Sequence, residues 1–271
     1  MVVVKRTIIF IALSILLSIP ALSLNIGISN PKVKLKISPG NVVTGSLSVN
    51  NPSSKEVKVK VYVEDFLYVP PYDGSKKFLP PGSVKNSCAQ WISFSPVEFK
   101  LPPFGRKNVE YSITVPPTAK GGYYAVMFFE TALGEIQETP TNRLLVLGRI
   151  GSLFLVETKE GIKKTRIDNI RTENSSIKGD FANTGNVFIN AKGTYFVMDS
   201  KGMIYDRGKV NDMFLFPEDK AQFTLNISEE VPQGSYILVC NFDLEDGDVA
   251  VKEVEFMKKH DNSIEILAVR D

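Results

Sequence analysis

Apolar and polar residues alternate along most of the chain, and this period of two constrains the fold more than any other feature. Successive side chains of a strand point to opposite faces, so the alternation predicts strands with one buried face. No amphipathic helical stretch separates these segments, and the sequence therefore predicts an all-β protein. The clearest examples are residues 32–37, 45–50, 57–63, 108–115 and 192–198.

The same order of signals occurs twice along the chain. In each half a strand ends in Asn and a tight turn, and a long strand ending in Asp follows. A Pro-led turn, an alternating strand, a Val-Pro stop and a Tyr-containing strand start then complete the unit. Asn hydrogen-bonds to its own backbone in turns, and proline cannot donate to a strand ladder. Both halves therefore have the same signals for turns and strand ends. The matched positions are Asn51 and Asn183, Asp65 and Asp199, Pro102 and Pro217, Val115 and Val231, and Tyr123 and Tyr236.

This repeat predicts two tandem immunoglobulin-like β-sandwich domains after a signal peptide. Two glycines interrupt the apolar run that joins the halves, and we expect the domain boundary near Gly148. The expected domains are therefore 24–148 and 149–258. Residues 259–271 form a tail whose segment 263–269 has strand character and is expected to add a strand to a sheet or to another chain.

The first 23 residues have the organisation of a secretory signal peptide. A short basic region at Lys5 and Arg6 precedes an apolar stretch over 8–19, and small residues follow up to Ser23. The alternative is an uncleaved N-terminal anchor. With cleavage after Ser23, the sequence predicts a periplasmic, secreted or cell-surface location and no membrane span in the mature chain.

Charge and composition disfavour several classes of function. The chain has 32 Lys and Arg against 30 Asp and Glu, without the basic excess of a nucleic-acid binder. Its only histidine, His260, lies in the tail, which argues against a catalytic triad or a histidine-rich metal site. The acidic run 243–248 resembles a calcium loop in composition, but Asp246-Gly247 fits a hairpin turn better. We therefore expect no enzyme activity, no cofactor and no metal.

Two cysteines, Cys88 and Cys240, fall in different predicted domains. A disulfide is possible in an oxidising compartment, but the sequence favours two buried free thiols.

The stretches "WISFSPVEFKLPPF" and "VPPTAKGGYYAVMFFE" carry a likeness to a known family. They resemble the N-terminal domain of periplasmic pilus-assembly chaperones (PapD-like), and also related bacterial surface proteins with chaperone-like immunoglobulin domains. The likeness covers roughly 31–150. In such chaperones a strand with alternating apolar side chains is donated to an incomplete subunit, whose C-terminal carboxylate binds basic residues between the domains.

The resemblance implies a partner-binding strand over 143–150, with Leu145 and Leu147 on one face. It implies Arg143 as a carboxylate anchor at the start of this strand and Lys34 or Lys36 as a second cation. The alternative for these lysines is an ordinary edge strand that lysines protect from unwanted pairing.

The sequence thus predicts a non-enzymatic, chaperone-like factor that binds another extracytoplasmic protein, such as a pilin-like or surface subunit. The insert 66–90, rich in Pro, Gly and aromatic residues, is expected to be a loop that adds specificity through Tyr68, Tyr72 and Phe78. An alternative function uses the same aromatics, exposed on a structural or adhesive module, to bind a cell-wall or envelope polymer.

Overall fold

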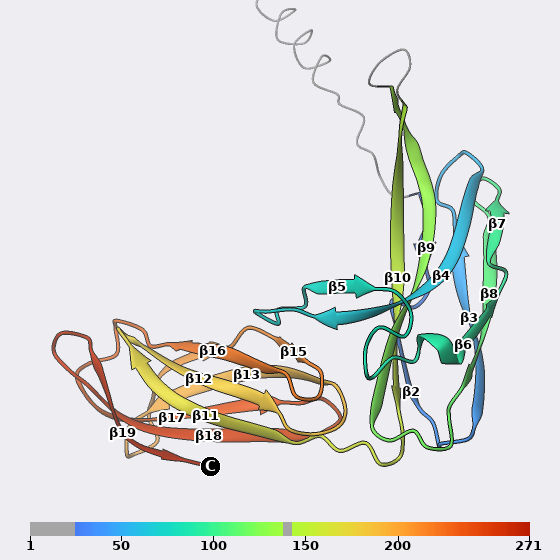
Figure 1. Ribbon diagram of the computed structural model, residues 1–271. Helices are drawn as coiled ribbons and strands as arrows, with labels where there is room; N and C mark the ends of the chain where they lie inside the picture. Colours follow the sequence, from blue (N-terminus) through green and yellow to red (C-terminus); the bar gives the residue numbers. More distant parts are fainter. Residues whose placement is uncertain (1–24, 138–142) are drawn as a thin grey trace, which may run out of the picture.

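The computed structural model describes residues 25–137 and 143–271, which form two β-sandwiches set at an angle to each other (Figure 1). The fold prediction is confirmed: the protein is all-β with two tandem immunoglobulin-like domains. Within the described residues, the helical element is a short 3-10 turn, η1 (Ala89–Trp91). The predicted signal peptide lies outside the described residues.

The first sandwich pairs a four-stranded sheet with a larger one. The four-stranded sheet has the antiparallel order β1 (Gly27–Ile28), β3 (Val42–Asn50), β8 (Arg106–Thr114) and β6 (Ile92–Ser95). The larger sheet has the order β2 (Lys32–Lys36), β10 (Arg143–Glu157), β9 (Gly122–Gln137), β4 (Val57–Tyr68) and β5 (Lys76–Leu79), and β7 (Glu98–Leu101) also pairs with β4.

The stretch "WISFSPVEFKLPPF" carries the chain from one sheet to the other. Its first strand, β6, pairs with β8 in the four-stranded sheet, and its second strand, β7, pairs with β4 in the larger sheet. The bend at Pro96 lies between them. This crossing joins the two layers along one side of the core.

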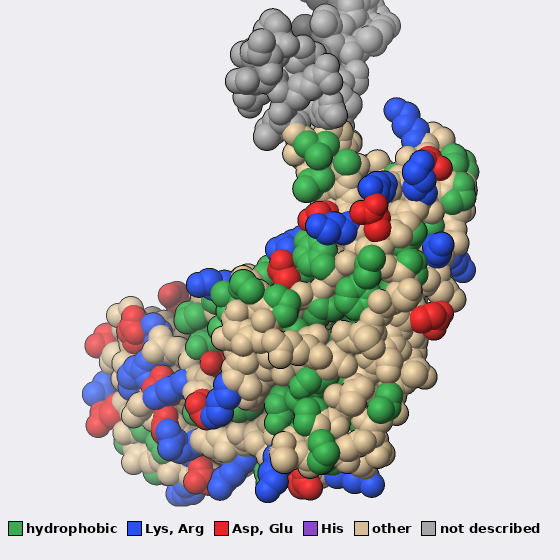
Figure 2. Space-filling model, turned by 45° about the vertical axis from the view of Figure 1, so that its right-hand side comes forward, with side chains coloured by type: hydrophobic (Ala, Val, Ile, Leu, Met, Phe, Trp, Pro, Cys, Tyr) green, Lys and Arg blue, Asp and Glu red, His purple; other side chains and the backbone are tan. Residues whose placement is uncertain are grey.

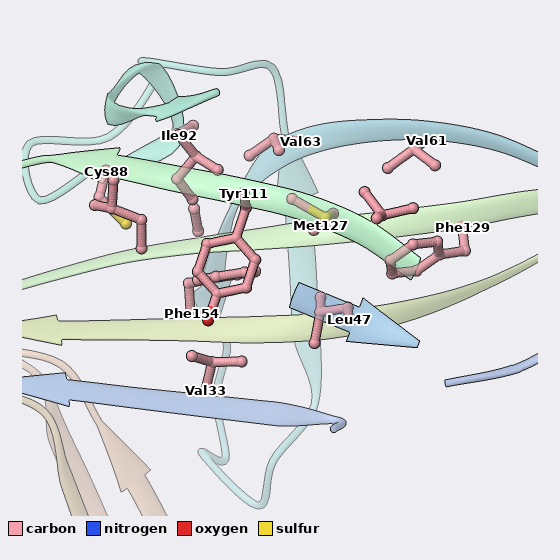
Figure 3. Packing of buried hydrophobic residues seen from close by; sticks show 14 of the residues in the cluster. Val33, Leu47, Val61, Val63, Cys88, Ile92, Tyr111, Met127, Phe129 and Phe154 are labelled. Atoms are coloured by element: carbon pink, nitrogen blue, oxygen red, sulfur yellow. The ribbon is translucent and has the colours of Figure 1, made fainter. Parts of the chain in front are cut away.

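Side chains from both sheets interdigitate between the two layers. Leu47 and Ile113 come from the four-stranded sheet, Phe154 and Met127 come from the larger sheet, and all four are fully buried. Tyr111 packs edge-on against Phe154, with ring centroids 5.0 Å apart (Figure 3). The predicted alternation therefore places one face of each strand in a close-packed core.

The second sandwich repeats this plan with its own core. One sheet has the order β11 (Thr165–Glu173), β12 (Ser176–Asn183) and β16 (Lys220–Asn226). The other has the order β14 (Ile204–Lys209), β13 (Ile189–Met198), β17 (Gly234–Asp243), β18 (Val249–Lys258) and β19 (Ile264–Arg270), with β15 (Met213–Leu215) also on β13. The predicted strand at 263–269 corresponds to β19, which pairs antiparallel with β18. The acidic run 243–248 forms the turn between β17 and β18, as its Asp-Gly pair indicates.

The repeated asparagines, Asn51 and Asn183, make equivalent hydrogen bonds in the two sandwiches. Asn51 is buried and donates to the carbonyl of Lys55 at 2.7 Å and to the carbonyl of Pro102 at 3.0 Å. Asn183 is buried and donates to the carbonyl of Val187 at 2.8 Å and to that of Leu215 at 3.1 Å. Each side chain therefore ties its own turn to the strand that precedes the Pro-led turn.

Asn183→Ala is expected to lower the free energy of unfolding by about 2–3 kcal/mol, because the carbonyls of Val187 and Leu215 lose a donor in a buried site. Urea unfolding measures this change. Asn211→Ala, at an exposed position, is the control and should stay within about 0.5 kcal/mol of the unchanged protein. A small effect at both positions would contradict the role assigned to Asn183.

The boundary expected at Gly148 is wrong, because β10 runs without a break from Arg143 to Glu157 and pairs with β9 to its end. Glycine does not end this strand. At Gly151 a Cβ atom would lie 2.8 Å from Val126 Cγ2, so the residue permits close packing against β9. We propose that the boundary lies in 158–164, between β10 and β11.

Both cysteines are buried and free, each in the core of its own sandwich, as the sequence favoured. Burial raises the pKa of the Cys88 thiol, and it raises the pKa of Cys240 to about 12. Neither thiol is therefore poised to react near neutral pH.

Candidate functional site: the free edge of β10 and the cleft at its end

One side of β10 is largely without a neighbouring strand in the described part of the chain. Its other side pairs with β9 over the whole strand, but β2 pairs with it only from Leu153 to Glu157. Residues 143–152 therefore present unpaired backbone N–H and C=O groups along an edge. In Figure 1 the β9–β10 hairpin projects from the first sandwich, away from the second one.

The free segment of β10 has an inner and an outer face. Ile150 packs against the core of the first sandwich, and Ser152 and Phe154 on the same face are fully buried. On the outer face, Leu145 and Leu147 are each 52% exposed. Figure 2 shows apolar side chains on the surface directly below the grey segments. The two leucines thus lie where the sequence predicts a partner-binding pair.

Arg149 follows these leucines on the outer face, where its side chain contacts aromatic and acidic groups. Its guanidinium lies 4.0 Å from the ring centroid of Phe128 and 5.1 Å from that of Phe78. It donates to the hydroxyl of Tyr62 at 3.1 Å and to the carboxylate of Glu64 at 3.1 Å. Sequence reasoning missed this residue, and the available signal was that the apolar alternation stops at position 149.

The opposite end of β10 lines a small cleft between the sandwiches. The cavity has a volume of about 180 Å³, and its walls come from β2, from the end of β10 and from the turn after β17. The lining residues are Lys34, Leu35, Lys36, Leu155, Glu157, Lys163, Phe188, Glu245 and Asp246. Lys34 and Lys36 therefore lie in the cleft where the resemblance placed a cation.

Two of the cleft lysines, Lys34 and Lys163, form ion pairs with acidic side chains of the second sandwich. Lys34 forms an ion pair with Glu245, which also accepts from the Asn190 amide at 2.8 Å. Lys163 donates to the carboxylate of Asp246 at 2.8 Å and to the carbonyl of Glu245 at 2.9 Å. The Lys34–Glu245 pair joins the β17–β18 turn to the first sandwich, and Lys163 joins the same turn to the segment between β10 and β11. The sequence alone did not reveal these contacts.

Glu157 is half-buried in this cleft, and burial raises the pKa of its carboxyl despite nearby Lys163 and Lys36. Folding therefore opposes ionisation of this group. The penalty is absent below the ordinary pKa of glutamate and grows as the pH rises from that value toward the folded pKa.

Glu157→Gln is therefore expected to raise the thermal midpoint at pH 7 and to leave it unchanged near pH 3, where the carboxyl is protonated in both states (about 4.3 is the ordinary pKa). Differential scanning calorimetry at the two pH values measures this. Glu160→Gln, at an exposed position, is the control. A gain of equal size at both pH values would contradict the argument.

Arg143 does not lie at the cleft, and its predicted role as an anchor there is wrong. Its backbone begins β10 opposite Gln137, at the projecting end of the hairpin. Leu155, which lines the cleft, is twelve residues further along the strand, or about 40 Å at 3.3 Å per residue. A carboxylate bound between the sandwiches is out of reach of this position.

The aromatic residues expected on an exposed loop are instead packed in the contact between the sandwiches. Tyr68 ends β4, is 4% exposed and stacks on Phe188 and Phe214 of the second sandwich at 5.5 and 5.3 Å. Tyr72 and Phe78 are partly buried against the same cluster. The insert 66–90 is thus not a free loop: it contains the end of β4, all of β5 and most of η1. These three residues offer no exposed aromatic platform for a polymer.

The comparisons with known proteins agree with this geometry. No family model matches the sequence, and no curated protein matches it. A solved structure of the Class 5 fimbriae chaperone CfaA matches with a TM-score of 0.52 and 17% identity, over 84% of this chain and 97% of that chain. A structure from a chaperone–tip adhesin complex of CFA/I fimbriae matches with a TM-score of 0.51 and 15% identity, again over 84% and 97%. This chain has the fold of the fimbrial chaperones.

Two further results concern the described residues. The described residues contain no helix long and apolar enough to cross a membrane. In residues 25–137 and 143–271, no group of three or more His, Cys, Asp or Glu side chains is placed to hold a metal ion.

Proposed function

We propose that this protein is an extracytoplasmic, non-enzymatic, chaperone-like factor that holds a secreted, pilus-type or envelope protein by β-strand addition. The observation that carries the proposal is the free edge of β10, with Leu145 and Leu147 exposed on one face. Strand addition uses backbone hydrogen bonds for affinity and alternate side chains for register, and this edge offers both.

The contrast with other edge strands supports this role. Natural sheets protect their edges with lysine, proline or bulges. Strand β2 carries Lys32, Lys34 and Lys36, and β5 carries Lys76 and Lys77. The free segment 143–152 contains neither lysine nor proline. Its pairing with β9 has one register shift, between Val146 and Leu147, but an edge of ten residues without lysine or proline is consistent with an edge that is used.

The fold and the cleft support the same function. One of the similar structures is a chaperone in complex with a tip adhesin. In this chain, a partner strand lying along the free edge would run about 23 Å from Leu145 to Ser152, where β2 begins to pair with β10. Lys34 and Lys36 of β2 line the cleft beyond that point. The N-terminal signal sequence supports a periplasmic or cell-surface location, where such partners assemble.

Affinity capture of the mature protein from its own envelope fraction tests the proposal. We expect a secreted or pilin-like subunit to co-elute in a stoichiometric amount, identified by mass spectrometry, and to depend on Leu145 and Leu147. Retention on cell-wall material without a protein partner would sink the proposal and favour a structural module.

A further inference from the structure

The apolar stripe on the outer face of β10 is short because Arg149 interrupts it. Positions 145, 147, 149, 151 and 153 share this face. Leu145 and Leu147 project into solvent, whereas Leu153 packs into the aromatic cluster between the sandwiches. Between them stand a charged residue and a glycine, so only two adjacent leucines are presented in the described part of the edge.

The side chain of Arg149 is fixed on the outer face by two kinds of contact. A guanidinium stacked on an aromatic face and bonded to a carboxylate is stabilised by both contacts. The side chains of Arg149 and Glu64 are only 35% and 24% exposed, so their ion pair is partly shielded from water. Gly151 lets Phe128 approach, because a Cβ atom there would lie 3.0 Å from Phe128 Cε1. Gly151 thus leaves room for the Phe128 ring, on which the Arg149 guanidinium stacks.

We propose that Arg149 sets the register of the added strand by ending the donated segment at Leu147. This inference rests on the proposed function. A partner that receives side chains from β10 in its apolar interior accepts Leu145 and Leu147, but a shift by two residues would bring the guanidinium into that interior. Burying a charge without a matched partner costs several kcal/mol, so the shifted register is excluded. The partner that fits is one with two adjacent apolar sites for donated positions two residues apart.

A photo-cross-linking experiment on the captured complex tests this. Leu145 is replaced with the apolar photoreactive residue p-benzoylphenylalanine, and mass spectrometry identifies the partner residue to which it joins. Three chains are compared: the otherwise unchanged protein, Arg149→Lys and Arg149→Leu. Cys88 and Cys240 stay in place, since both are buried.

We expect one cross-linked partner residue in the unchanged chain and in Arg149→Lys. In Arg149→Leu we expect a second site, two residues away, with at least roughly one tenth of the total yield. Leucines then fill both apolar sites in either register, so the two registers should differ by less than about 1.4 kcal/mol, which is a tenfold ratio. The lysine variant keeps the charge but loses the planar fork and the stacking. A merely structural role would make the lysine and leucine variants behave alike, which would overturn the proposal.

Strand addition and the role of Arg149 give separate results in this experiment. If the protein with Leu145 in place captures no protein partner, or if the chain with the photoreactive residue captures a partner but gives no cross-link to it from position 145, strand addition itself is wrong. If it gives one and Arg149→Leu leaves that single site unchanged, with a thermal midpoint that shows the variant is folded, strand addition stands and the role of Arg149 is overturned.

Discussion

Replacing Leu145 and Leu147 together with Asp is expected to abolish partner capture while leaving the protein folded. Each leucine is 52% exposed, so its burial by a partner contributes about half of the 1.5–3 kcal/mol of a fully exposed side chain. Two aspartates placed in an apolar site add a further cost of several kcal/mol. At 1.4 kcal/mol per tenfold, the affinity falls more than about 100-fold. Quantitative mass spectrometry of the captured material measures the loss.

The fold should tolerate the change because each side chain is already 52% exposed. Substitutions at such surface positions usually stay within about 0.5 kcal/mol in stability. The matched control is Leu267→Asp in β19, where the leucine is 51% exposed on the second sandwich. Undiminished capture by the double variant, or an equal loss in the control, would contradict a binding site on β10.

The internal repeat made the fold predictable because its signals act locally. Asn51 and Asn183 close turns within a few residues of themselves, and Val-Pro ends a strand wherever it occurs. The Tyr236 hydroxyl donates to the carbonyl of Pro232, beside the Val-Pro stop, at 2.9 Å. Such interactions are visible in sequence as spacing, so two sandwiches could be predicted without knowing how they meet.

The errors arose where distant segments decide the structure. Gly148 and Gly151 looked like a linker, yet the strand continues because β9 pairs with every part of it. The segment 66–90 looked like a loop, since four residues of β5 between Pro- and Gly-rich turns give too little alternation to predict a strand. Arg149 finds Phe78 and Phe128 only after β5 and β9 are folded beside it.

The site was predictable in part for the same reason. Leu145 and Leu147 alternate within one strand, so their shared face follows from the sequence. Whether the edge beside them is free depends on where β2 stops pairing with β10, which is a property of the folded sheet. The balance of Lys34 by Glu245 joins residues of different sandwiches and left no local signal.

Tyr68→Ala is expected to lower the free energy of unfolding by about 3–5 kcal/mol, the usual cost of removing a large buried aromatic. Tyr68 comes from the first sandwich, and its ring stacks on Phe188 and Phe214 of the second. Removing the Tyr68 ring leaves a cavity at the contact between the two sandwiches. Urea unfolding followed by fluorescence of Trp91, the only tryptophan, measures the change.

The control for this prediction is Tyr205→Ala, because Tyr205 is 41% exposed and packs edge-on against Tyr236 alone among the aromatic residues. Its loss should cost about 1 kcal/mol. The comparison also separates two functions for Tyr68. If Tyr68 bound a polymer, its replacement would reduce polymer binding and leave the free energy of unfolding nearly unchanged, as for other exposed stacking residues. A tyrosine that joins the sandwiches instead lowers stability, and the angle that sets the cleft beside β10 depends on it.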